Sequence, residues 1–330
     1  MSSTESSKVT LVNPTREVRE WKKSIFNLDA GFKGLMLLSA FVVLGIVGLI
    51  IAELVQRSSM AWEKFGLHFF SGSEWDPVSG GFGALPFIYG TIVSSLVAVV
   101  IAVPLAVAVA VFVTEMCPRP LRKPISYATE LLAAIPSVIY GLWAMFVLVP
   151  ILRMYVEPWL MKYFGWTGLF AGPAYGIGML AAGAVMAIMI IPIISSITRE
   201  VLVVVPQPQR EAALALGATR WEMIRMAVLR NARAGIMGAV ILGLGRALGE
   251  TMAVTMVIGN NPAIAKSLLA PGYTMASVIA NEFNEATSDL HRSALIEIGL
   301  ALFIVTIIVN ILAGLMVWTV TRGTPARTNA

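Results

Sequence analysis

Six long apolar segments constrain what this chain can fold into. They cover residues 32–52, 88–113, 131–149, 174–197, 234–258 and 300–320. A hydrocarbon core ~30 Å thick is crossed by about 20 helical residues, so each segment is long enough to span a membrane. The strands of a transmembrane β-barrel would instead be short and alternating. The sequence therefore predicts an all-α integral membrane protein with six transmembrane helices.

The composition agrees with this class and excludes several others. Hydrophobic residues make up 57% of the chain and charged residues 13%, which is too apolar for a water-facing surface. The single cysteine, Cys117, and the two histidines, His68 and His291, exclude an internal disulfide framework and a Cys/His zinc site. We therefore expect no metal and no cofactor.

The basic residues predict an orientation rather than a nucleic-acid partner. They are concentrated before residue 34, at 119–123, at 199–233 and after residue 321, with few in the other connections. Because Lys and Arg are enriched in cytoplasmic loops, we expect both termini in the cytoplasm. The domains predicted are a cytoplasmic tail over 1–31, a membrane domain over 32–320 and a short cytoplasmic tail over 321–330. Charge distributed in this way gives no basic face for nucleic acid.

The fifth segment carries two charges, Arg246 and Glu250. A charge near the bilayer centre costs at least ~2.5 kcal/mol, so both should face the protein interior or water. Glu250 lies four residues after Arg246, so we expect the two side chains to share one face of the helix, where Glu250 can neutralise Arg246. Two interpretations stay open: a structural ion pair, or a path for an oxyanion, which a guanidinium fits geometrically.

The other connections and the remaining membrane residues allow simpler interpretations. Aromatic residues at 150–173 predict a short helix resting in the headgroup region. The connection at 53–87 suits a docking surface or an ordinary solvated loop. Glu130 and Glu297 are expected to reach the membrane surface, and glycines 243, 245 and 249 to allow close helix packing.

The connection at 199–233 predicts two short helices. Pro206 and Pro208 can begin the first, and Gly217 can end it. Thr219 and Glu222 then form a capping box for the second. An ordinary amphipathic linker would explain the helices but not the small residues around a break.

Four of those residues carry a resemblance to a known family. Glu211-Ala212-Ala213 followed by Gly217 resembles the EAA loop of ABC importer permeases. The resemblance implies that Glu211, Ala212, Ala213 and Gly217 contact a separate ATPase subunit, with a coupling helix inserted in its groove. The chain departs from the family pattern after the loop, where Ala227 and Arg230 replace the expected Ile and Pro.

A longer resemblance indicates the cargo. Residues 82–85, 88–91, 130–137, 243–254 and 280–283 are similar, in order, to the PstC-type permeases of phosphate-specific importers. This implies the type I ABC importer permease fold, inorganic phosphate as substrate, and a bacterial inner membrane. It also implies a PstA-like second permease as heterodimer partner, a PstB-like ATPase dimer, and a PstS-like phosphate-binding protein outside. Arg246 and Glu250 would then lie on the substrate pathway.

Other functions remain as alternatives. No Lys follows a Gly in the chain, so the phosphate-gripping loop of P-loop ATPases is absent and hydrolysis would need a partner. With only Arg246 and Glu250 charged at membrane depth, we expect a non-catalytic subunit. A permease for sulfate, molybdate or phosphonate is the nearer alternative, and an ion-coupled secondary anion transporter using Glu250 for the proton is the more distant one.

Overall fold

The computed structural model describes the backbone of residues 14–321 and the side chains of residues 31–319. Within that part, six helical segments are long and apolar enough to cross a membrane, which confirms the predicted number. Contacts divide the chain into residues 1–56 and 57–330, and each unit is described by itself. The six segments are Gly31–Arg57, Leu85–Met116, Ser137–Thr167, Met179–Val204, Arg220–Leu248 and Asp289–Thr319.

The first unit is nearly all one helix. Helix α1 runs over Pro14–Arg57 and begins well inside the segment expected to be a tail. The ends of the predicted tails, residues 1–13 and 322–330, lie outside the described residues.

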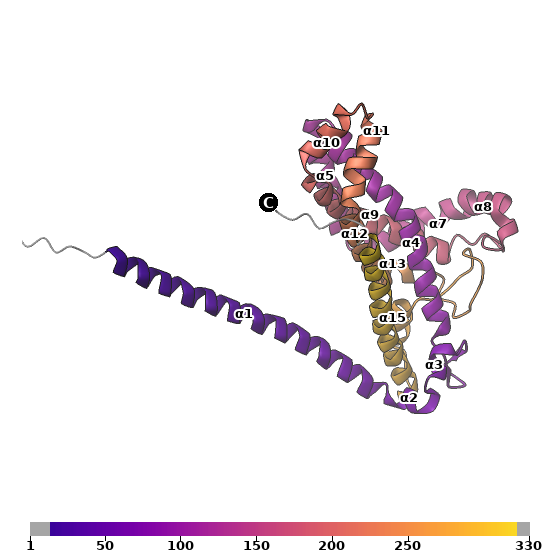
Figure 1. Cartoon of the computed structure of the whole chain (residues 1–330). Coiled ribbons are helices and arrows are strands. Elements are labelled where there is room, and N and C mark those ends of the chain that lie inside the picture. Colours follow the sequence, from indigo (N-terminus) through magenta and orange to yellow (C-terminus); the bar gives the residue numbers. More distant parts are fainter. Residues whose placement is uncertain (1–13, 322–330) are drawn as a thin grey trace, which may run out of the picture. The chain divides into compact units, whose positions relative to one another are not determined.

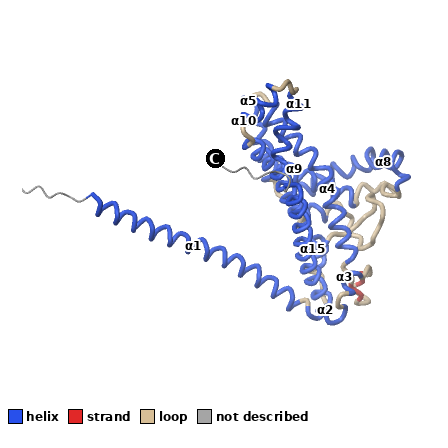
Figure 2. Tube along the Cα trace, viewed as in Figure 1, coloured by secondary structure: helices blue, strands red, loops and turns tan. Residues whose placement is uncertain are grey.

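The second unit is a helical bundle with two very short strands (Figures 1 and 2). Its longest elements are α4, α9, α12 and α15, and residues 112–116, 144–148, 152–156 and 224–229 are π-helical turns within longer helices. The elements are α2 Ser59–Phe65, α3 His68–Ser71, β1 Trp75–Asp76, β2 Gly81–Phe82, α4 Leu85–Val111, α5 Arg119–Ala134, α6 Ser137–Trp143, α7 Val149–Ile151, α8 Glu157–Phe164, α9 Met179–Val204, α10 Gln207–Ala215, α11 Arg220–Met223, α12 Arg230–Leu248, α13 Met252–Thr255, α14 Met275–Glu282 and α15 Asp289–Thr321.

Helix α9 forms the centre of this bundle. Two thirds (67%) of its most apolar stretch is buried, more than in any of the other five spans. On the neighbouring α4, Ala98, Ala102 and Ala106 are fully buried at a spacing of four residues. Small side chains at that spacing let two helix backbones approach closely. A Cβ at Gly183 of α9 would lie 2.5 Å from Val97 of α4, so this contact has no spare room.

The third span begins later than predicted. We expected it at 131–149, but α5 ends at Ala134, Ile135 is extended, and α6 begins at Ser137. Pro136 explains the break, because a proline disfavours helical backbone at the residue before it and donates no hydrogen bond. Helix α5 has no buried side chain. Its Glu130 accepts a 2.8 Å hydrogen bond from Arg199 of α9 and forms an ion pair with it.

The expected interfacial helix exists, but it belongs to the third span. Helix α8 follows α6 through α7 and two π-helical turns without a gap, so helix continues from Ser137 to Phe164. The aromatic side chains of Trp159 and Tyr163 are exposed, with ring centroids 5.3 Å apart. Exposed aromatics on the surface of a membrane helix agree with a position at the headgroups.

The connection at 53–87 is ordered by a cluster of aromatic and polar groups. Trp75 of β1 donates a 2.9 Å hydrogen bond to Glu282 of α14, which also lies 3.1 Å from His291. The Trp75 ring packs edge-on against Phe87, and nearby Tyr273 accepts a hydrogen bond from Asn281. Burial raises the pKa of Tyr273 to about 12, so this phenol stays neutral. The strand pair β1–β2 is thus fixed to the ends of α4, α14 and α15.

Glu297 of α15 does not reach the membrane surface as expected. Its side chain is fully buried, with an exposed fraction of 0%. Within the described part of the chain, neither of its carboxyl oxygens has a hydrogen-bond partner.

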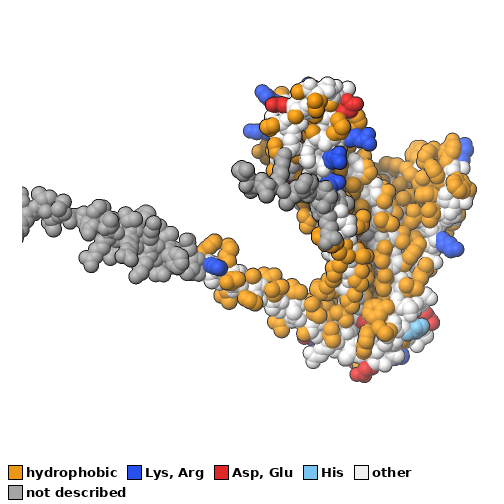
Figure 3. All heavy atoms as spheres, viewed as in Figure 1, with side chains coloured by type: hydrophobic (Ala, Val, Ile, Leu, Met, Phe, Trp, Pro, Cys, Tyr) orange, Lys and Arg blue, Asp and Glu red, His pale blue; other side chains and the backbone are white. Residues whose placement is uncertain are grey.

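Basic side chains gather at one end of the second unit. Helices α5, α10 and α11 lie together there, opposite the end that carries α2 and α3 (Figure 1). Lys and Arg side chains are visible around α10 and α11, while hydrophobic side chains cover the length of the helices between the two ends (Figure 3). The segments 119–123 and 199–233, which the sequence placed on one side of the membrane, thus lie on one side of the bundle.

Candidate functional site

The connection at 199–233 contains the two short helices that the sequence predicted. Helix α10 follows Pro206 and ends at Ala215, and Gly217 turns the chain with φ +82°. Thr219 then caps α11: its hydroxyl accepts from the Glu222 N–H at 3.3 Å, and its own N–H donates to Glu222 Oε2 at 2.8 Å. The left-handed backbone at Gly217 and the capping box therefore set the bend between the helices.

The four residues of the family motif do not share one surface. Glu211, Ala212 and Gly217 are exposed, whereas Ala213 is half-buried against an apolar cluster that includes Leu202. A Cβ at Gly217 would meet no atom within 4 Å. The outer face of α10 and the bend that follows it are therefore open to another protein, and Ala213 seats the helix on its own chain.

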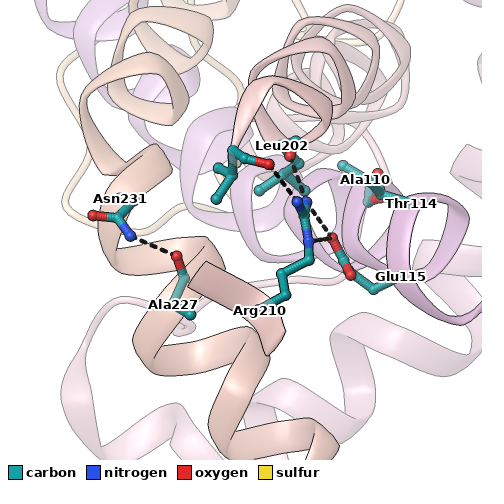
Figure 4. Close-up of polar contacts among 8 residues, drawn as sticks. Ala110, Thr114, Glu115, Leu202, Arg210, Ala227 and Asn231 are labelled. Carbon is teal, nitrogen blue, oxygen red and sulfur yellow. Dashed lines mark hydrogen bonds and ion pairs between the residues drawn. The ribbon is translucent and has the colours of Figure 1, made fainter. Parts of the chain in front are cut away.

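Arg210, which sequence reasoning did not single out, holds α10 in place. Its guanidinium donates to Glu115 Oε1 at 2.9 and 3.3 Å, to the Leu202 carbonyl at 2.8 Å and to the Val205 carbonyl (Figure 4). Its position beside Glu211 was the only signal in the sequence, because Glu115 lies 95 residues away.

A cleft of about 670 Å³ lies beside this contact. Arg119, Arg122 and Arg220 line it together with Arg210, and the acidic residues on its wall are Glu115 and Glu211. The cleft joins the surface of α10 to the beginning of α5, so it belongs to the same face as the helix pair.

The second predicted site lies on a broken helix rather than a continuous one. We expected residues 234–258 to form one helix, but α12 ends at Leu248 and α13 begins only at Met252. Arg246 is in the last turn of α12, and Glu250 is in the break. The expectation that both share one helical face is therefore wrong. Among the described residues they form no ion pair with each other, and Glu250 Oε1 instead accepts from the Ala253 N–H at 3.4 Å.

Packing of α13 explains why the helix breaks. A Cβ at Gly141 of α6 would lie 2.6 Å from Met256 Sδ and 3.0 Å from Ala253 Cα. Ala253 and Val254 are fully buried. Since α13 is held this closely against α6, the chain leaves the axis of α12 at Gly249.

Arg246 lies on an open face of α12. Its side chain is exposed, and Gly245 next to it has room for a Cβ with no atom within 4 Å. A Cβ at Gly249 would lie 3.9 Å from the carbonyl oxygen of Gly245, one turn earlier. Close packing by a glycine, expected for all three positions, is found at Gly243, whose Cβ would lie 2.7 Å from Ile194 of α9.

The chemistry of this face suits an anion and disfavours lipid. The carbonyl end of a helix favours a cation in its last turn, which stabilises the charge of Arg246 where it stands. Broken backbone at membrane depth is tolerated only where it is buried in protein or lines a water-filled path. Arg246 is exposed beside the break in the isolated chain, so within a membrane this face needs either a covering protein or a water-filled path.

No group of residues suited to a metal ion is present among those described. Six helices long and apolar enough to cross a membrane, an exposed helix pair at one end and a charged break in the fifth span are the features of a polytopic membrane protein.

Comparison with known proteins gives the family. Residues 102–321 match the model of the binding-protein-dependent transport system inner membrane component. The phosphate transport system permease protein PstC of Mesorhizobium japonicum is 48% identical over 90% of this chain and 92% of its own length. PstC of Xylella fastidiosa strain 9a5c is 47% identical over 98% and 99%. The chain therefore belongs to the PstC branch of the binding-protein-dependent permeases, and is a multi-pass inner membrane protein.

Solved structures agree on the fold. A bacterial ABC transporter involved in the import of the acidic polysaccharide alginate matches 92% of this chain and 99% of its own, with a TM-score of 0.57 and 16% identity. An inward facing conformation of the MetNI methionine ABC transporter matches 73% and 95%, with a TM-score of 0.50 and 20% identity. The type I ABC importer permease fold predicted from the sequence is confirmed.

Proposed function

We propose that this chain is the membrane-spanning permease subunit of an ATP-driven importer of inorganic phosphate. The observation that carries the proposal is the relationship to PstC permeases, which extends at 47% identity over 98% of the chain. The exposed pair of helices α10 and α11 offers a surface on which an ATPase could act, and the exposed Arg246 on a broken span offers a cation for an anionic substrate.

The substrate is tested by uptake. Cells lacking their own phosphate permease should recover uptake of radioactive phosphate when this chain is produced with its transporter partners. Excess unlabelled phosphate should compete with the labelled phosphate, whereas the same concentration of sulfate, molybdate or a phosphonate should not. Competition by sulfate as strong as by phosphate would move the proposal to another oxyanion, and uptake that persists without the ATPase would favour an ion-coupled transporter.

The end of the bundle that carries α10 and α11 faces the cytoplasm in this proposal, with both chain termini on that side. One subunit of a PstB-like ATPase dimer then contacts Glu211, Ala212 and the bend at Gly217. The chain itself is non-catalytic. A PstA-like permease completes the heterodimer in the lipid bilayer, and a PstS-like receptor delivers phosphate to the opposite end.

We further propose that Arg246 and Glu250 line the substrate pathway where the two permeases meet. An unpaired anion is strongly disfavoured at low dielectric, and a fixed guanidinium lowers that barrier. Arg246 is exposed on its own chain, so the sister permease must cover it or a water-filled path must reach it. Glu250, held by α13 in this structure, can compete for the guanidinium when the path is empty.

The pathway is tested by charge removal. Arg246→Gln should abolish uptake with the transporter still assembled, and Glu250→Gln should impair it by leaving Arg246 free to retain the anion. Lys162→Gln, which removes an exposed charge from α8, should transport normally. Because removing both members of a purely structural pair should restore function, recovery of uptake in Arg246→Gln/Glu250→Gln would refute the pathway.

A further inference from the structure

Arg210 fastens the coupling-type helix α10 to the ends of two other helices. Its guanidinium reaches Glu115, at the end of the helix that continues α4, and the carbonyls of Leu202 and Val205, at the end of α9 (Figure 4). The Arg210 and Glu115 side chains are only 12% and 9% exposed. We call this contact the Arg210 clamp.

The clamp supplies hydrogen-bond donors at the end of α9, where the Leu202 carbonyl also accepts from the Val205 N–H at 3.3 Å. The last carbonyls of a helix lack intrahelical donors, and a cation is favoured at that end. Hydrogen bonds between a guanidinium and a carboxylate are about twice as strong as neutral ones. A buried charge left without its partner is costly, so opening the clamp is disfavoured.

Helix α9 can carry a displacement onward to the candidate pathway. At Gly235, a Cβ would lie 2.4 Å from Val201 of α9, and at Gly243 it would lie 2.7 Å from Ile194. At these two glycines α12 packs directly against α9, and neither position has room for a side chain. Because packed helices of this kind move as rigid bodies, a shift at the end of α9 displaces α12 and with it Arg246.

A second tie attaches α10 to the beginning of α12. Asn231 Nδ2 donates to Gln209 Oε1 at 2.6 Å and to the Ala227 carbonyl at 2.7 Å. Helix α10 is therefore joined through adjacent residues to α9, α4 and α12, whereas its outer face is open.

We propose that Arg210 is a positioning residue that transmits the motion of α10 to the helices lining the pathway, and that Glu115 holds it in register. The proposal rests on the proposed function, since it requires that α10 couple to an ATPase. Weakening the clamp leaves ATP hydrolysis intact but uncouples it from phosphate movement.

The test uses the whole transporter reconstituted in vesicles with its ATPase, sister permease and phosphate receptor. ATP hydrolysis and phosphate uptake are measured on the same preparation. In Arg210→Gln and in Glu115→Gln, uptake per ATP should fall about two- to thirtyfold while hydrolysis stays within about twofold of the unsubstituted transporter. Arg210→Lys keeps the charge but not the fork of donors. Its uptake per ATP should lie between that of Arg210→Gln and that of the unsubstituted transporter.

The control removes an arginine from the same cleft without touching the clamp. Arg119 lines the cleft from the beginning of α5, and Arg119→Gln should keep the normal uptake per ATP. A purely structural role would lower hydrolysis and uptake together, or prevent assembly in both Arg210→Gln and Glu115→Gln, and either outcome overturns the proposal.

Gly217→Val separates this proposal from the function on which it rests. If Gly217→Val is uncoupled but an assembled Arg210→Gln transporter shows normal uptake per ATP, the proposed role of the Arg210 clamp is overturned and the coupling role of the loop stands. Normal coupling in Gly217→Val as well overturns the coupling role of the whole loop. Absence of ATP-dependent phosphate uptake by the unsubstituted transporter overturns both.

Discussion

Gly217 offers a direct test of how the helix pair works, because its backbone and its surroundings make separate predictions. Its φ of +82° is left-handed, and a Cβ there would meet no atom of the described residues within 4 Å. Ala therefore brings no clash, only the left-handed cost of about 1–2 kcal/mol. At 1.4 kcal/mol per factor of ten, the bent form should become about 5- to 30-fold less populated. Asn tolerates this conformation better than Ala, and a β-branched Val tolerates it least.

The assay is phosphate uptake per ATP in the reconstituted transporter, with thermal unfolding measured in parallel. Coupling should fall in the order Gly, Asn, Ala, Val. Gly238→Ala in α12 is the matched control, since a Cβ there also meets no atom within 4 Å but the backbone is not left-handed. Equal coupling for Gly217 and Ala would refute the backbone argument. Equal loss for Asn and Val would show that side-chain bulk against the ATPase decides instead.

Two further predictions concern orientation and stability. A cysteine in place of Arg220 should be labelled only from the cytoplasm, and one in place of Lys64 only from outside; the reverse pattern would overturn the topology and the coupling role with it. Glu297→Leu should raise the unfolding temperature, because it removes a fully buried carboxyl that has no partner among the described residues, a defect that costs about 1–3 kcal/mol. A lower unfolding temperature, with Glu297→Gln unchanged, would mean that the carboxyl is hydrogen-bonded.

Features set by local chemistry could be predicted from the sequence. The number of spans follows from apolar length, which needs no knowledge of packing. The α10–α11 pair was equally accessible, because Pro206, Gly217 and the Thr219–Glu222 capping box each act within one turn of helix. The two helices and the end of the first one before Gly217 are confirmed, whereas the contact of Glu211 with an ATPase stays a prediction.

Features set by contacts between distant segments could not be read in this way. Arg210 carries no sign of its partner in the local sequence, since the pairing with Glu115 depends on where α4 and α9 end. Glu297 gave the opposite error: a carboxyl near a helix end usually reaches water, but the Glu297 side chain is completely buried.

The break at Gly249 shows why the candidate pathway was only half predictable. Charge alone identified Arg246 and Glu250, because any ionised side chain in an apolar span requires a protein or water neighbour. Their geometry was wrong because the apolar residues continue past Glu250 without a proline, and such a run is indistinguishable from one helix. What ends α12 is the tight seat of α13 on Gly141, a glycine more than a hundred residues earlier in the chain. The same contact that breaks the helix therefore also separates the two charges, which form no ion pair with each other among the described residues.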